Sequence, residues 1–160
     1  MYKLSLFKYN NNNVFKKYTL LAAINYNGVV GWTLYNEGCI TAERLILFLD
    51  KFIKNKMKKN LIIMDNAGAH RNKIIKNYIN DSGNQLHYSI PYKPKTNAIE
   101  TLFSQFKHNL IQKQGKGITF SHLKKTIKKV ITKIDTKSYT NILKYAYKNK
   151  DNRKIIKSVY

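Results

Sequence analysis

The sequence predicts an α/β fold in which helices pack on a mixed β-sheet. Two apolar runs, 20–25 and 29–34, flank Asn27-Gly28, the dipeptide most typical of a tight β-hairpin. Two further short apolar runs, 61–64 and 86–90, alternate with stretches of helical periodicity. The resulting order is hairpin, helix, strand, helix, strand and then helices, which is typical of a sheet covered by helices.

Capping residues and breaks in periodicity set the expected limits of the elements. Residues 1–17 carry only a weak alternation of apolar and polar residues, which ends in an asparagine run. Thr41 predicts the N-cap of a helix that extends to about residue 57. Leu61–Met64 is a continuous apolar run, so we expect a central strand covered on both faces. A second helix is expected over about 70–81, ending at 82–84.

The C-terminal half is expected to be mainly helical. A long helix is predicted to begin near Asn97, after a loop that carries both prolines, and to break at 114–117. Ser121 is expected to cap the next helix, and a last helix spans about 138–148. The residues expected to face the core from all of these helices are Leu45, Phe48, Leu49, Phe52, Ile53, Ile74, Ile75, Tyr78, Ile79, Ile99, Leu102, Phe103, Phe106, Leu110, Leu123, Ile127, Val130, Ile131 and Ile134.

The charge of the chain indicates a polyanionic partner. Thirty lysines and arginines stand against eight acids, which gives a net charge of +22. An A- and T-rich coding sequence would also enrich Lys, Asn, Ile and Tyr, but that bias should raise Asp and Glu as well, and they are scarce. Nucleic acid is the most common polyanion in cells, so DNA or RNA is the expected partner.

Length and composition exclude several classes of protein. With 160 residues the chain is expected to be one domain, 1–160, that buries a real core. No apolar run approaches the roughly 18 residues of a membrane span, and the apolar part of residues 1–8 is too short for a signal peptide. Cys39 is the single cysteine, which excludes a disulfide framework. An intracellular protein without membrane contact is therefore expected.

Two acidic residues occupy positions where carboxylates often do chemistry. Asp65 lies at the C-terminal end of a predicted parallel strand, where such sheets bind ligands, and small residues after it leave room for a substrate. Its structural alternative is to cap the next helix. Glu100 lies three residues after Asn97, the spacing of a capping box, and that structural role does not exclude a role in a site. Two acids that converge at one sheet edge, in so basic a chain, suggest divalent metals acting on phosphodiesters.

Other polar residues leave their interpretation open. His70 orients a carboxylate, contacts a phosphate or begins a helix. The histidines at 87, 108 and 122 show no metal-ligand spacing. The lysine pairs 124–125 and 128–129 fall on the outward side of an amphipathic helix, where they form either a solvated face or phosphate contacts.

These strings together resemble the catalytic core of the DDE transposases, specifically the mariner-like group and its bacterial insertion-sequence relatives. The matching residues are 64–70 and 91–100, followed by Phe103 and Lys107. The resemblance covers about 18–112, which leaves 113–160 as a basic helical C-terminal extension. It implies an RNase H-like fold and DNA cleavage and strand transfer that depend on Mg²⁺ or Mn²⁺.

The resemblance also implies roles for particular residues. Asp65 and Glu100 match catalytic acids that bind the metal. The residues expected to contact DNA are His70, Arg71, Lys93, Lys95 and Lys107.

The chain departs from the family pattern in three places. Ala98 replaces the usual proline at the first helical position, and Lys93 stands where serine is usual. The family uses three carboxylates, the first on a strand just before the hairpin, yet no Asp or Glu precedes Glu37, which follows the hairpin. We therefore expect the first catalytic strand to be lacking or altered.

These departures limit the expected activity. The chain resembles the C-terminal part of a transposase whose reading frame was cut, without the helix-turn-helix region that recognises transposon ends. It is expected to be weakly active or inactive alone, with a second copy or an upstream transposase fragment as a possible protein partner. The alternative is a non-catalytic basic DNA-binding remnant of a transposase.

Overall fold

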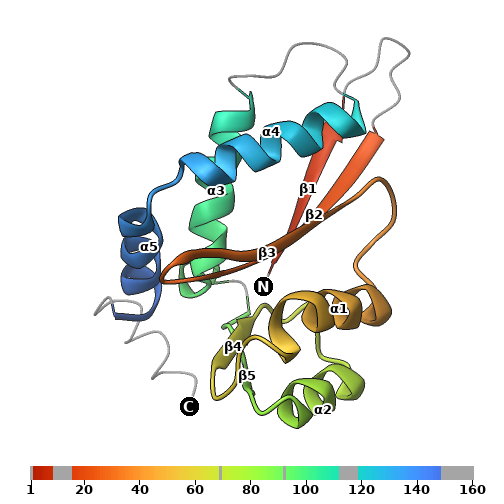
Figure 1. Cartoon of the computed structure of the whole chain (residues 1–160), viewed down its shortest axis with the longest axis vertical. Coiled ribbons are helices and arrows are strands. Elements are labelled where there is room, and N and C mark those ends of the chain that lie inside the picture. Colours follow the sequence, from red (N-terminus) through yellow and green to blue (C-terminus); the bar gives the residue numbers. More distant parts are fainter. Residues whose placement is uncertain (1, 9–15, 69, 92, 112–118, 149–160) are drawn as a thin grey trace.

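The computed structural model describes residues 2–8, 16–68, 70–91, 93–111 and 119–148. In chain order the elements are β1 (Tyr2–Lys8), β2 (Lys16–Asn25), β3 (Gly28–Tyr35), α1 (Ala42–Leu49), β4 (Leu61–Met64), α2 (Lys73–Asp81), β5 (Gln85–Tyr88), α3 (Ala98–Ile111), α4 (Phe120–Lys133) and α5 (Thr136–Lys148) (Figure 1). A π-helical turn at Asp50–Lys54 continues α1, and a 3₁₀ turn at Pro94–Thr96 precedes α3. This order is the one that the sequence predicts, with β1 in addition.

The strands form an antiparallel sheet and a separate parallel pair. β1, β2 and β3 lie side by side in that order, and the β2–β3 turn places Gly28 at a φ of 136°, which favours glycine. β4 pairs in parallel with β5, with Met64 opposite Tyr88. Among the described strands β4 has no other partner, and Leu61 is 58% exposed. The expectation of a central strand covered on both faces is therefore wrong for β4.

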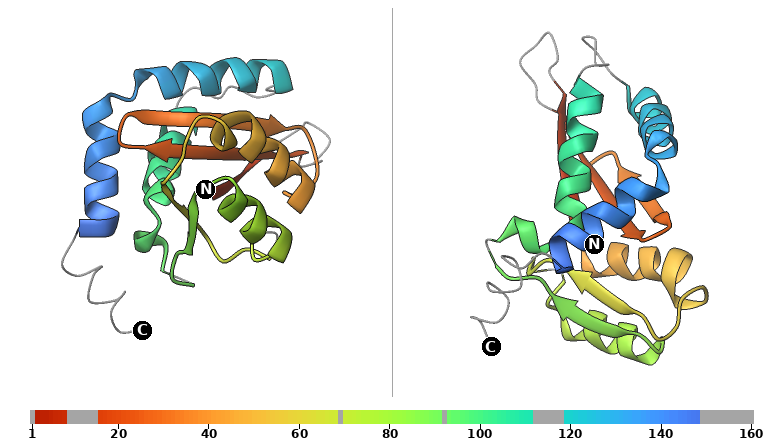
Figure 2. Two further views of the ribbon diagram at one scale, coloured as in Figure 1. Left: turned by 60° about the horizontal axis from the view of Figure 1, so that its bottom comes forward. Right: turned by 90° about the vertical axis from the view of Figure 1, so that its left-hand side faces the viewer.

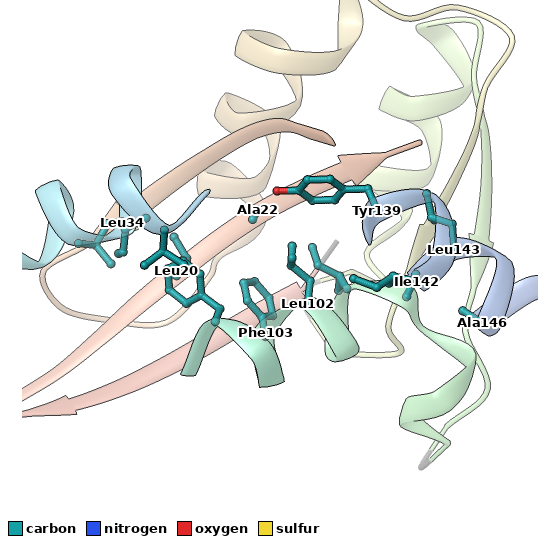
Figure 3. Close-up of a cluster of buried hydrophobic side chains, with 14 of the residues drawn as sticks. Leu20, Ala22, Leu34, Leu102, Phe103, Tyr139, Ile142, Leu143 and Ala146 are labelled. Atoms are coloured by element: carbon teal, nitrogen blue, oxygen red, sulfur yellow. The ribbon is translucent and has the colours of Figure 1, made fainter. Parts of the chain in front are cut away.

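β2 is buried on both faces, and each face belongs to a different hydrophobic cluster. Leu20 and Ala22 pack with residues of α3, α4 and α5 in one cluster (Figure 3). Leu21 and Ala23 point the other way, because side chains alternate along a strand, and pack with residues of α1, β4 and α2. The sheet is therefore a middle layer, with α4 and α1 on its opposite faces (Figure 2).

Local capping explains where most helices begin. The Thr41 hydroxyl oxygen accepts the Arg44 N–H at 3.3 Å, which confirms the predicted cap of α1. The prediction for Ser121 is wrong: Thr119 caps α4 by accepting the His122 N–H at 3.2 Å. The ring of Phe120, the first residue of α4, packs against Tyr18 with 5.9 Å between centroids.

Two other helices differ slightly from the predicted limits. α2 begins at Lys73 rather than residue 70, because the Asn72 side chain accepts the Ile74 N–H at 2.9 Å. α5 begins at Thr136 rather than residue 138, and the Asp135 carboxylate accepts the Ser138 N–H at 2.7 Å. The predicted break at 114–117 lies outside the described residues.

Most of the residues predicted to face the core do so. The helical residues of that set that are buried are Leu45, Phe48, Leu49, Ile53, Ile75, Ile79, Ile99, Leu102, Phe103, Phe106, Leu123, Ile127 and Val130. Ile74 is 59% exposed, so its predicted burial is wrong; it follows the cap Asn72 closely, on the outer side of the first turn of α2. The side chain of Leu110 lies outside the described part. None of the described helices combines the length and apolar character that a membrane span requires.

Gly31 allows a close approach between β3 and the segment after α1. A Cβ at this position would collide with the Phe52 ring, which itself packs on Phe48 with 4.9 Å between centroids. We expect Gly31→Ala to lower the free energy of unfolding by about 1–3 kcal/mol, because overpacking forces neighbours out of place. Urea unfolding measures this change. Gly68→Ala is the matched control, since a Cβ there meets no heavy atom within 4 Å, and an equal loss in both variants would contradict the collision.

Candidate active site

The C-terminal ends of β4 and β5 are joined by two hydrogen bonds. The Ser89 N–H donates to the Met64 carbonyl oxygen at 2.7 Å. The Asn66 side-chain amide donates to the Ser89 carbonyl oxygen at 2.9 Å. Asp65 lies between the two bonded residues Met64 and Asn66, so its backbone is held at this edge of the parallel pair.

Two groups contact the Asp65 carboxylate. His70 Nδ1 contacts one of its oxygens and lies 3.3 Å from the Asp65 backbone carbonyl oxygen. The Ala67 N–H donates to the same carboxylate oxygen at 3.3 Å. His70 itself is 1% exposed, and its carbonyl oxygen accepts the Tyr88 hydroxyl at 2.7 Å. The imidazole is therefore fixed in place, and of the interpretations that the sequence left open, orienting a carboxylate is the one that fits.

The environment of Asp65 favours its charged form. Burial by itself raises the pKa of this carboxyl, since it penalises charge. The hydrogen bond and charge of His70, together with the Ala67 N–H, act in the opposite direction and outweigh it. The pKa of Asp65 therefore lies below its ordinary value, and the side chain is ionised at neutral pH.

Glu100 is held in the first turn of α3. The Glu100 N–H donates to the Asn97 carbonyl oxygen at 3.1 Å, and Asn97 directly precedes the helix. An acid in the first turn is stabilised by the helix dipole. The Ala98 N–H donates to the Tyr147 hydroxyl oxygen at 3.3 Å, so α5 fastens the start of α3. A proline at position 98 has no N–H to donate, so the departure from the family pattern makes this bond possible.

Asp65 and Glu100 line one open cavity of about 850 Å³. Its lining comes from the ends of β4 and β5, the loop after β5 and the start of α3. The residues that line it are Asp65, Asn66, Arg71, Ser89, Ile90, Pro91, Lys93, Pro94, Asn97 and Glu100. The two acids that the sequence singled out are therefore brought together, in a setting with two cationic side chains.

The remaining predicted DNA contacts lie in different settings. Arg71 and Lys93 are exposed and line the cavity. Lys95 and Lys107 are exposed but are not part of its lining. His70 is buried beneath Asp65, so the expected contact between His70 and DNA does not fit its position.

Several residues that shape the cavity were not singled out from the sequence. Asn66, Tyr88 and Tyr147 each donate or accept one of the bonds that fix the loop and the helix start. Asn97, which the sequence placed at the helix start, is 4% exposed and also lines the cavity, and its Nδ2 atom has no hydrogen-bond partner among the described residues. Asn66 could have been identified from the sequence, because it directly follows Asp65 in the motif. Tyr147 could not, because it lies far along the chain from its partner Ala98.

The donor set of the cavity is that of a hard cation. Carboxylate and amide oxygens are the ligands that Mg²⁺ and Mn²⁺ take in proteins. Among the described residues no group of three His, Cys, Asp or Glu side chains could hold a metal ion. Asp65 and Glu100 are the two acidic side chains that line the cavity, and the described residues add no third one to it.

Comparison with known proteins agrees with this geometry. Residues 5–132, more than half of the chain, match the sequence model of the DDE superfamily endonucleases. The chain belongs to this family. No curated protein is similar enough in sequence to count as a relative.

Solved structures of Mos1 transposase have the same fold. The Mos1 transposase catalytic domain with raltegravir and Mn has a TM-score of 0.76 and 16% identity, covering 90% of this chain and 74% of that chain. The catalytic domain of Mos1 mariner transposase has a TM-score of 0.76 and 18% identity over the same shares. The Mos1 mariner paired-end complex with Mn has a TM-score of 0.73 and 19% identity, covering 87% of this chain and 44% of that one. The RNase H-like fold is confirmed.

β1 bears on the absence of an acidic residue before the hairpin. A strand is present before the hairpin, so of the two expected alternatives the altered strand is the one that the structure shows. Its sequence, Tyr-Lys-Leu-Ser-Leu-Phe-Lys, contains no acid. The described chain therefore has the fold of the family, and its strand before the hairpin carries no carboxylate.

Removing the imidazole beside Asp65 tests the electrostatics of the site. We expect His70→Ala to raise the pKa of Asp65, because the hydrogen bond and charge that favour the carboxylate are lost. The free energy of unfolding should fall by about 1–3 kcal/mol at pH 6, the cost of losing a hydrogen bond to a charged group. A carboxyl whose pKa is lowered by folding stabilises the fold at pH values above its unfolded-state pKa, and this contribution is lost as the pH falls. The difference in stability between the wild type and the His70 variant should therefore shrink below pH 3.8.

Carbon NMR of the carboxyl group measures the pKa, and urea unfolding measures stability. His122→Ala, on the exposed surface of α4, is the matched control and should leave Asp65 unchanged. An unaltered titration of Asp65 in the His70 variant would contradict this account.

Proposed function

We propose that this chain is a transposase-type DNA endonuclease domain that holds one divalent cation between Asp65 and Glu100 and has little or no cleavage activity by itself. The observation that supports the proposal best is the shared cavity of the two acids. Membership of the DDE endonucleases and the fold of Mos1 transposase agree with it. Structures of Mos1 transposase include complexes with Mn, with Mg and with a transposon end, and by similarity we extend Mg²⁺ or Mn²⁺ and DNA to this chain.

Different residues of the cavity would bind the cation and the DNA. Asp65 is ionised and oriented by His70, so it is ready to act as a ligand. Glu100 faces the same cavity from a helix start that Tyr147 fixes in place. Arg71 and Lys93 place positive charge at the lining, where a phosphodiester backbone would be attracted. A bound divalent cation supplies Lewis-acid polarisation of a phosphodiester.

The small number of carboxylates at the cavity supports low phosphodiester-cleavage activity. Phosphodiester cleavage by this class of site is most effective with two metal ions about 3.5–4 Å apart, which share a bridging carboxylate. The described residues supply two acids at the cavity and no cluster of three. The same observation favours the second candidate, a basic DNA-binding protein that keeps fold and charge without catalysis.

Metal titration separates the two candidates. We expect isothermal titration with Mn²⁺ to show one site, and Glu100→Gln to weaken binding by about tenfold or more, since even indirect ligand partners contribute that much. Glu37→Gln is the matched control: Glu37 is exposed in the loop after β3 and does not line the cavity. Equal binding in all three proteins, or none in the wild type, would favour the non-catalytic candidate.

A plasmid-nicking assay with Mg²⁺ or Mn²⁺ tests the expected lack of activity. The wild-type chain should convert little or no supercoiled plasmid to nicked circles, because one cation is not enough for efficient cleavage. The Asp65→Ala variant sets the background in the same assay. Robust nicking by the wild type that disappears in Asp65→Ala would contradict the prediction and establish an active enzyme.

A further inference from the structure

One surface of the molecule carries a cluster of positively charged side chains that do not line the cavity. It is the outer side of α4, whose exposed lysines are Lys124, Lys125, Lys128, Lys129 and Lys133. α4 contains no acidic residue, and none of these lysines forms an ion pair with a described residue. We call these five side chains the α4 lysine face.

The arrangement of these lysines costs stability in the free protein. Lys124 and Lys128 are four residues apart, as are Lys125, Lys129 and Lys133, so each row stacks on one side of the helix. Like charges at this spacing destabilise a helix by about 0.2–0.5 kcal/mol per pair. The repulsion is relieved when a polyanion lies along the face.

The lysines of the basic segment 51–56, in contrast, contact other side chains of the protein. Lys54 lies 3.6 Å from an Asp50 carboxylate oxygen and 4.8 Å from the Tyr78 ring centroid. Lys51 and Lys56 lie over the Phe52 ring, 5.3 Å and 6.0 Å from its centroid. These cations have partners inside the protein, whereas no such contact of the α4 lysine face is found with the described residues.

Burial of the inner side of α4 decides which polyanion fits. Leu123, Ile127 and Val130 are buried against the sheet, so α4 has no free apolar side to insert into a lipid bilayer. The exposed side offers no Phe, Tyr or Trp on which unpaired bases could stack. It also offers no Arg, Asn or Gln, the side chains that most often read base edges. Lysines alone suit the phosphates of a duplex without regard to its sequence.

The α4 lysine face and the cavity occupy different parts of the molecule. α4 covers one face of the antiparallel sheet, and β4 and β5, whose ends line the cavity, lie beyond its other face (Figure 2). No α4 residue lines the cavity. DNA bound to α4 is therefore a different stretch from DNA at Asp65 and Glu100.

We propose that the α4 lysine face is a second DNA-binding surface, which holds the phosphate backbone of double-stranded DNA independently of sequence and of metal. The 14 residues of helix α4 extend about 20 Å, the length of about six base pairs. The proposal rests on the proposed function only in taking DNA as the partner. A duplex held there would keep the protein on DNA while a separate stretch enters the cavity.

The test compares two variants that lose the same number of charges. In the α4 variant the residues changed to glutamine are Lys124, Lys125, Lys128 and Lys129. In the control variant the residues changed to glutamine are Lys51, Lys54, Lys56 and Lys58, which are all exposed and lie on the other side of the sheet. Glutamine forms helices about as well as lysine, so α4 should remain folded, and circular dichroism checks this.

Binding is measured by fluorescence anisotropy with a labelled 30-base-pair duplex of arbitrary sequence, in EDTA and across a salt series. The slope of log affinity against log salt should become shallower by about 3–4 in the α4 variant, since each phosphate contact contributes about 0.9. The control variant should change far less. A double variant, Lys124→Gln with Lys128→Gln, should lose about half as much slope, and it serves if the fourfold variant is unfolded.

Each other outcome overturns the proposal. Equal losses in the α4 and control variants would mean that net charge alone attracts DNA. No loss in the α4 variant would mean that α4 does not touch DNA. A larger effect of the α4 variant on a single-stranded 30-mer, or on vesicles containing phosphatidylserine, would identify a different partner. Because EDTA removes metal, failure of the Mn²⁺ titration would overturn the proposed catalytic site and leave this result unaffected.

Discussion

Burial of β2 on both faces is the constraint on which the rest of the structure depends. Leu20 and Leu21 are adjacent in sequence, and each is at most 1% exposed, so opposite sides of one strand form the centres of two hydrophobic clusters. Side chains alternate along a strand, so a shift of one residue in its pairing would exchange the two sets. The hairpin turn at Gly28 and the pairing of Ala22 with Trp32 fix that register.

The two clusters position the two acids. Met64, buried in the same cluster as Leu21, directly precedes Asp65. Ile99, buried in the same cluster as Leu20, directly precedes Glu100. The cavity that both acids line therefore lies where the ends of two separately packed units meet. Polar bonds complete the placement, since Asn66 joins the ends of β4 and β5 and Tyr147 joins α5 to the start of α3.

Features that depend on neighbouring residues could be predicted from the sequence. The Asn27-Gly28 turn, the Thr41 cap and the first turn of α3 each follow from a few adjacent side chains. Features that depend on distant contacts could not. Thr119 and Ser121 have equivalent capping side chains and lie two residues apart, and only the structure shows that Thr119 is the cap. The hydrogen bond from Ala98 to Tyr147 joins residues 49 positions apart, and no local sequence pattern predicts it.

The most direct test of the account is paramagnetic broadening of backbone amide NMR signals by Mn²⁺ at substoichiometric concentration. Unlike a binding isotherm, it locates the ion. If Asp65 and Glu100 hold a cation together, the amides of Asp65, Asn66 and Glu100 should broaden first and to similar extents. Broadening that centres on other exposed acids, such as Glu37 or Asp81, or that reaches Asp65 without Glu100, would contradict a shared site.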